Sequence, residues 1–195
     1  MNEELAELQE ALREKRPMTW DTLPDIPLYM DQVLAYMDRQ LIKADESDSL
    51  TSAMVNNYTK SGLVPRAEGK KYSRDHLAYL TAICVLKQVM SAKDMALVIR
   101  EKTAGEHPVS ELYQLFADSL DQALRYTAQE MDGYLDKEKL ADGAIHFALL
   151  SYAAGLVSRR YVHILREDGT QPDARREKKE KKSRHTSKQE GAIER

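Results

Sequence analysis

Residues 51–80 read TSAMVNNYTKSGLVPRAEGKKYSRDHLAYL, and this stretch indicates how the chain folds. Thr51 or Ser52 can cap a short helix that ends at Gly62. The Gly-Leu-Val-Pro corner then turns the chain into residues 64–73, whose composition suits an extended hairpin or wing. Ser73 can cap a second helix. The stretch therefore predicts a helix, a corner, a basic wing and another helix in succession.

Apolar residues at helical spacing extend this reading to most of the chain. Three prolines between residues 17 and 27 interrupt the pattern and predict an irregular connector. The helices are expected at 3–15, 28–41, 51–61, 74–90, 91–102, 110–131 and 137–166. Only the wing at 64–74 is expected to form β structure. The predicted fold class is all-α, with a winged helix-turn-helix, a small β wing and a C-terminal helical region.

The composition suits a soluble globular protein, since 42% of the 195 residues are hydrophobic and 31% are charged. No apolar run approaches the roughly 20 residues that span a bilayer. The acidic, amphipathic N-terminus lacks the features of a secretion signal. We therefore expect a cytoplasmic protein with no membrane partner.

A single cysteine excludes an internal disulfide and a zinc site with several cysteines. Cys84 lies in the apolar helical run LAYLTAICVLKQVM, where it is expected to be a small buried hydrophobic residue.

Positive charge is concentrated in one segment of this acidic chain, whose formal net charge is −3. Residues 60–76 contain five bases but only two acids, Glu68 and Asp75. In a winged helix-turn-helix, the second helix enters the major groove and the wing contacts phosphates. Asn56 and Asn57 have side chains that can hydrogen-bond adenine edges. The residues predicted to contact DNA are Thr51, Ser52, Asn56, Asn57, Tyr58, Lys60, Arg66, Lys70, Lys71, Tyr72 and Arg74.

The same residues resemble the DNA-binding half of mercury-resistance-type (MerR-like) transcriptional regulators. Those proteins share a helix followed by a Gly-Leu-Leu-Pro corner and a basic wing ending in Tyr-Ser. Over about 18–165 the chain also resembles an uncharacterised bacterial family, a domain of unknown function predicted to contain this motif. The resemblance implies a sequence-specific, dimeric DNA-binding regulator, with Tyr58, Lys60, Tyr72 and Arg74 near the DNA. Asn56 and Asn57 stand where MerR-like proteins usually have Arg and Tyr, which implies a different operator.

The residue patterns predict an N-terminal helix (1–16), a proline-rich connector (17–27) and a disordered basic tail (168–195). Together with the resemblance, they place the winged helix-turn-helix at 28–104 and a helical region that dimerises at 105–167. The expected partners are double-stranded DNA and a second copy of the chain.

Two interpretations stay open beside this one. The chain could instead be a helical protein–protein interaction module that has lost DNA binding, which the acidic segment 44–49 and the amides at 56 and 57 favour. Seven side chains in the C-terminal half line either the core or the pocket of a small-molecule effector: Tyr113, Phe116, Tyr126, Tyr134, His146, Phe147 and Tyr152.

Catalysis has little support in the sequence. The chain has no Gly-rich phosphate loop, no Gly-x-Ser-x-Gly motif and no His-Glu-x-x-His motif. Its five histidines are scattered, without a second histidine or a cysteine at ligand spacing. We therefore expect no enzymatic activity, no cofactor and no metal.

Overall fold

A computed structural model describes residues 2–42, 48–104 and 107–169. The described residues are mostly helical, and none of them belongs to a strand, so the all-α prediction is confirmed. The helices are α1 (Glu3–Glu14), α2 (Met30–Met37), α3 (Ser52–Lys60), α4 (Arg74–Leu86), α5 (Ala92–Thr103), α6 (Val109–Glu130) and α7 (Leu140–Gly169). Most of the acidic segment at 44–49 and nearly all of the tail predicted at 168–195 lie outside the described residues.

The chain divides into two compact units, residues 1–153 and 154–195. The first unit contains α1 to α6 and the N-terminal part of α7. In the second unit, residues 154–169 continue the α7 helix.

The core of the first unit is built around α4. Leu77, Leu80 and Ile83 have no exposed surface, and α4 packs against both α2 and α6. Apolar side chains on more than one side of a helix are expected when neighbours cover those sides. Cys84 lies in the same core, as predicted from its apolar surroundings.

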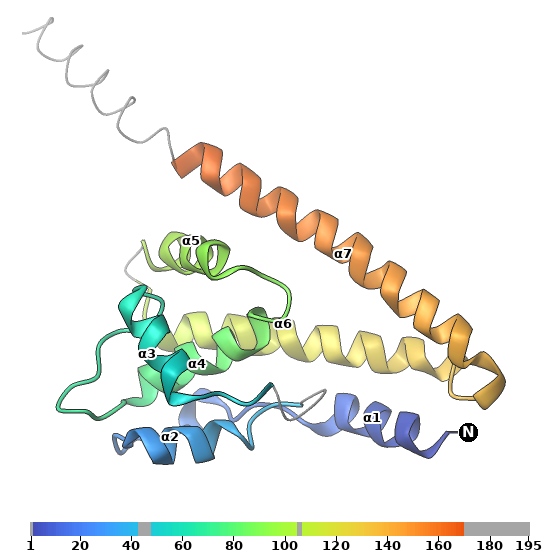
Figure 1. The fold of residues 1–195 in the computed structure, drawn as a ribbon, viewed down its shortest axis with the longest axis horizontal. Helices are drawn as coiled ribbons and strands as arrows, with labels where there is room; N and C mark the ends of the chain where they lie inside the picture. The colour runs from blue at the N-terminus through green and yellow to red at the C-terminus, as the bar shows by residue number, and fades with distance from the viewer. Residues whose placement is uncertain (1, 43–47, 105–106, 170–195) are drawn as a thin grey trace, which may run out of the picture. The chain divides into compact units, whose positions relative to one another are not determined.

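Helix α1 packs on α6, and the two run side by side (Figure 1). Gln9, 6% exposed, donates from its amide nitrogen to the Ala128 carbonyl and to Asp132, each at 2.8 Å. Arg16 pairs with Asp121 further along α6. Since a buried amide must find hydrogen-bond partners, Gln9 specifies this contact beyond the apolar packing. The N-terminal helix thus packs on its own chain.

Helix α7 leaves much of its apolar surface uncovered. Ile145, Leu149 and Tyr152 in the first unit are 60–62% exposed, and Tyr161 in the second unit is 68% exposed. The range Lys137–Asp168 is long and apolar enough, by length and composition alone, to cross a membrane. The search for unbroken apolar runs did not identify this range, because mean hydropathy over a stretch of 18 residues tolerates isolated charges that such a run does not.

Candidate nucleic-acid interface

Helix α3 presents one exposed face and buries the other. The Thr51 side chain caps it by accepting a hydrogen bond from the Met54 backbone N–H at 3.3 Å. Val55 is completely buried and attaches the helix to the core. Asn56, Asn57 and Lys60 are exposed, and the spacing of Asn56 and Asn57 from Lys60 places them on one side of the helix. Neither asparagine amide has a hydrogen-bond partner in the described chain.

The Gly-Leu-Val-Pro corner is the C-terminal cap of α3. Gly62 adopts a left-handed conformation with φ +74°. The Leu63 N–H donates to the Tyr58 carbonyl at 2.9 Å, and the Gly62 N–H donates to the Thr59 carbonyl at 3.2 Å. These two bonds form a Schellman motif, which explains why glycine stands here. Leu63 and Val64 are then 1% exposed, so the chain passes directly from the cap into the core.

The segment predicted to be a β wing is instead a tight turn with isolated bridges. Glu68 and Lys71 exchange two backbone hydrogen bonds of 3.2 and 2.9 Å around Gly69 and Lys70, whose φ angles are +55° and +66°. Positive φ at both central residues is typical of the tight two-residue hairpin turn. No ladder continues from it, because Val64 enters the core and Pro65 has no N–H to donate.

The base of this turn is held by the start of α4 and by Leu28, which lies two residues before α2. Leu28 and Tyr72 exchange backbone hydrogen bonds of 2.9 and 2.8 Å. His76 accepts from the Ser73 N–H at 3.0 Å, and its other ring nitrogen lies 3.3 Å from the Arg66 carbonyl oxygen. His76 is 6% exposed, and the sequence analysis did not single it out. Its spacing of three residues from the predicted cap Ser73 is the signal that could have identified it, since this is the geometry of a capping box.

Three of the predicted contact residues are partly or wholly buried. Tyr72 is 6% exposed and packs edge-on against His76, with ring centroids 5.5 Å apart. The guanidinium of Arg74 lies over the Trp20 ring at 5.7 Å. Burial raises the pKa of the half-buried Tyr58 hydroxyl. Tyr72 is therefore inaccessible, and Arg74 and Tyr58 keep only part of their surface accessible.

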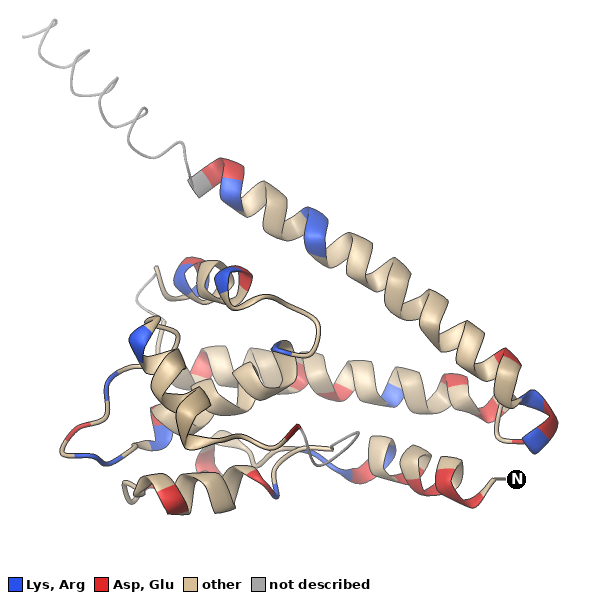
Figure 2. Cartoon of the chain, in the orientation of Figure 1, with Lys and Arg blue, Asp and Glu red and all other residues tan. Residues whose placement is uncertain are grey.

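The predicted contact residues that remain exposed lie on α3, at its N-cap and on the loop that follows it. Thr51 and Ser52 are exposed at the start of α3, Lys60 at its end, and Arg66, Lys70 and Lys71 on the loop that follows. Figure 2 shows this loop between α3 and α4 marked mainly by Lys and Arg, with one acid among them.

Lys71 extends over the ring of Tyr29, 5.4 Å from its centroid. Lys60, Arg66 and Lys70 make no ion pair within the described chain. We call Asn56, Asn57, Lys60, Arg66 and Lys70 the polar surface.

The aromatic residues considered for an effector pocket lie in separate places. Tyr113 contacts Phe116 and Trp20, with centroids 6.2 Å apart in both pairs. Tyr134 stacks on His146 at 4.9 Å and meets Phe147 edge-on at 6.0 Å. Tyr126 and Tyr152 are exposed. The seven side chains therefore do not line one pocket. Within the described ranges, no three of the residues His, Cys, Asp and Glu form a group that could hold a metal ion.

The family model for a domain of unknown function, DUF1836, matches residues 18–116, just over half of the chain. The chain belongs to the DUF1836 family. The matched region includes α2 to α5 and the polar surface, and it ends within the first turns of α6. No curated protein and no solved structure matches the chain.

Proposed function

We propose that this DUF1836 protein is a cytoplasmic, dimeric DNA-binding transcriptional regulator of the MerR-like type, without enzymatic activity. Helix α3 reads bases, and the turn at Glu68–Lys71 contacts the adjacent phosphates. The observation that carries this proposal is the polar surface, since its amides and cations are exposed and lack partners among the described residues.

Helix α3 is suited to enter a major groove. Its N-terminus is capped, its inner side is fixed by Val55, and its outer side carries two adjacent asparagines. Asparagine can bond the N6 and N7 atoms of adenine with both ends of its amide. Because neither amide is used within the described chain, neither must break an internal bond in order to bind a base.

The turn supplies the contacts that position the helix. Lys70 and Arg66 lie on the loop beyond α3, while Lys60 lies at the end of α3 itself. Phosphate contacts of this kind fix the register of a protein on the duplex but carry no base specificity. His76 holds the loop through the Arg66 carbonyl, which limits the entropy that the loop loses on binding.

The second copy is expected to bind through α7. Ile145, Leu149 and Tyr152 are spaced four and three residues apart and therefore share one face of the helix. Exposed apolar surface of this extent marks an interaction site. A membrane is the weaker explanation, because the segment between the charges of Asp142 and Arg159 has sixteen residues, or about 24 Å of helix, against a hydrocarbon core of about 30 Å.

The experiment that tests DNA recognition is selection from a random double-stranded library at low salt. We expect enrichment of a two-fold symmetric site, with Asn57→Ala altering the preference at one position per half-site. A library that shows no enrichment would refute the regulator. That result would favour the alternative, a helical interaction module that has lost DNA binding, for which the exposed apolar face of α7 is the supporting observation.

Dimerisation is tested by light scattering on the full chain. Leu149→Asp with Tyr152→Asp should convert a dimer into a monomer, whereas the control Ile26→Asp, at a side chain that is 72% exposed, should leave the dimer intact. Recovery of the wild-type protein with membranes, or a wild-type monomer at high concentration, would contradict this assignment.

A further inference from the structure

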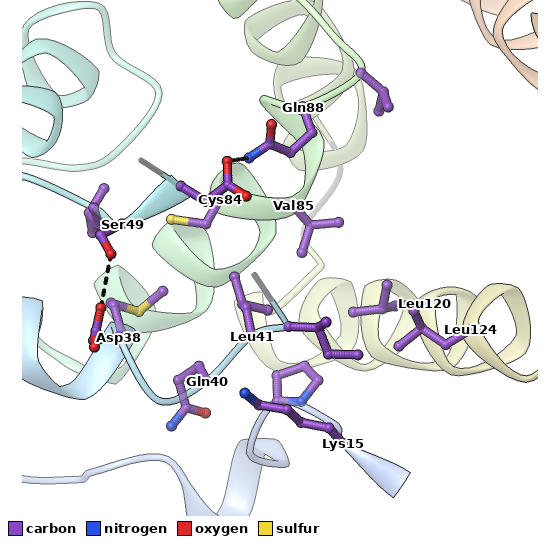
Figure 3. Close-up of a pocket in the computed structure, with 16 residues that line it drawn as sticks. Lys15, Asp38, Gln40, Leu41, Ser49, Cys84, Val85, Gln88, Leu120 and Leu124 are labelled. Atoms are coloured by element: carbon purple, nitrogen blue, oxygen red, sulfur yellow. Dashed lines mark hydrogen bonds between the residues drawn. The ribbon is translucent and has the colours of Figure 1, made fainter. Parts of the chain in front are cut away.

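A cavity of about 590 Å³ lies in the first unit, beside the connection between α2 and α3 (Figure 3). Its apolar wall is formed by three elements: Leu41 and Leu50 from the connection, Cys84 and Val85 from α4, and Leu120 and Leu124 from α6. Protein interiors contain few voids larger than a water molecule, and ligand pockets range from about 300 to 1,000 Å³. The cavity therefore has the size of a ligand site.

The rim of the cavity is polar, and most of its groups are paired. Gln88 donates to the Asp48 carboxylate at 2.9 Å, and Ser49 donates to the Asp38 carboxylate at 3.1 Å. Lys15 also lines the cavity, and its ammonium group makes no ion pair within the described chain. Figure 3 shows the Lys15 side chain extending beside Gln40, below Leu41.

We propose that this cavity binds an apolar carboxylate, a molecule with an aliphatic or aromatic body and a single anionic head. The body fills the apolar wall, and the carboxylate pairs with Lys15. A ligand without an apolar body would leave the wall in contact with water, which is unfavourable. A cationic head would be repelled by the ammonium group of Lys15. The two carboxylates of the rim, which could attract it, already have hydrogen-bond partners.

The position of the cavity connects the ligand to α3. Leu50, 9% exposed, lines the cavity and directly precedes Thr51, the cap of α3. Both described parts of the α2–α3 connection, Asp38–Ile42 and Asp48–Leu50, lie against it. A bound ligand therefore contacts the segment that sets the start of α3, and we infer that occupancy changes DNA affinity. This regulatory part rests on the proposed function, whereas ligand binding does not.

The test uses Cys84 as an internal reporter, since it is the only cysteine of the chain and lies in the cavity wall. Alkylation by N-ethylmaleimide is followed by mass spectrometry with decanoate, with 1-decanol as its uncharged counterpart, or with neither. We expect decanoate to slow the alkylation of Cys84 at least fivefold. Lys15→Gln should weaken decanoate binding about two- to fivefold, as expected for loss of an exposed ion pair, and leave decanol binding unchanged.

Two variants on α6 locate the site. Leu124→Trp fills the cavity and should abolish protection, whereas Leu115→Trp, on the same helix but outside the cavity wall, should preserve it. Circular dichroism confirms that both variants are folded. If Leu124→Trp does not fold, Val85→Phe serves the same purpose with a smaller increase in volume.

Each outcome decides one part of the proposal. Absence of protection by both probes overturns the ligand site, and equal protection in Leu124→Trp places the binding elsewhere. An identical effect of Lys15→Gln on both probes overturns the carboxylate assignment. If decanoate protects Cys84 but leaves the affinity for a selected DNA site unchanged, the regulatory part fails. A chain that selects no DNA refutes the proposed function, while protection of Cys84 still establishes the ligand site.

Discussion

The cations of the polar surface allow a quantitative test of DNA binding. The variant combines Lys60→Gln, Arg66→Gln and Lys70→Asn. All three side chains are exposed and make no ion pair in the described chain, so their removal should leave the fold intact. Lys70 has φ +66°, a conformation that asparagine tolerates better than most residues, so Lys70→Asn removes the charge without straining the turn.

The expected magnitude follows from the release of counterions. Each phosphate contact contributes about −0.9 to the slope of the logarithm of affinity against the logarithm of salt concentration. Raising the salt from 50 to 200 mM therefore costs about 3.5-fold in affinity per contact, and about 40-fold for three contacts. Loss of all three should make the slope shallower by about 2.7.

Fluorescence anisotropy with a labelled duplex of about 30 base pairs measures this slope, even before an operator is known, because phosphate contacts occur on any sequence. The matched control is Lys93→Gln with Lys102→Gln and Lys137→Gln, which removes the same charge from exposed positions on α5 and η4 (Lys137–Lys139).

The same slope for the polar-surface variant and the control would contradict phosphate binding by these three side chains. Equal slopes would mean that net charge, rather than the placement of Lys60, Arg66 and Lys70, governs the attraction. A wild-type slope near zero would contradict DNA binding itself.

Three further predictions concern substitutions at single positions. Asn57→Ala should relax base preference at one operator position by about 1–3 kcal/mol without changing the salt slope, and a uniform loss across sequences would assign Asn57 to phosphate instead. Gly62→Ala should lower the free energy of unfolding by about 1–2 kcal/mol in urea, because its φ is +74° while no atom lies within 4 Å of the added Cβ. Gly133 also has open space around the added Cβ but no positive φ, so Gly133→Ala should be nearly neutral. An equal loss of unfolding free energy in the two variants would contradict backbone strain at position 62. Burial raises the pKa of the Cys84 thiol from 9.0 to about 11, so the unfolded chain loses this proton first as the pH rises. Stability should therefore fall by about 1.4 kcal/mol more between pH 8 and pH 10 than it does in Cys84→Ala, and identical pH profiles would contradict the shift.

The elements of α3 and its surroundings follow closely from local sequence. Thr51 caps the helix, Val55 anchors it and Gly62 ends it, as the pattern predicts. Each of these features depends on residues within a few positions of one another, where capping and backbone conformation decide the outcome. The wing was predicted less well, because β pairing needs two segments with free backbone groups on both sides, and Val64 and Pro65 remove one side.

Three features can be read from the chain without its structure: the helical fold class, the place of the α3 cap and corner, and the concentration of bases at residues 60–74. These depend on periodicity, capping residues and composition, which are local properties. The packing of distant segments was needed to establish that Tyr72 is buried, that Arg74 lies over Trp20, and that His76 holds the loop at Arg66. It also decided that the α2–α3 connection borders a cavity with α4 and α6. The physical reason is that burial and pairing depend on which distant segments pack together, and polar or aromatic residues with the same local pattern can face either solvent or core.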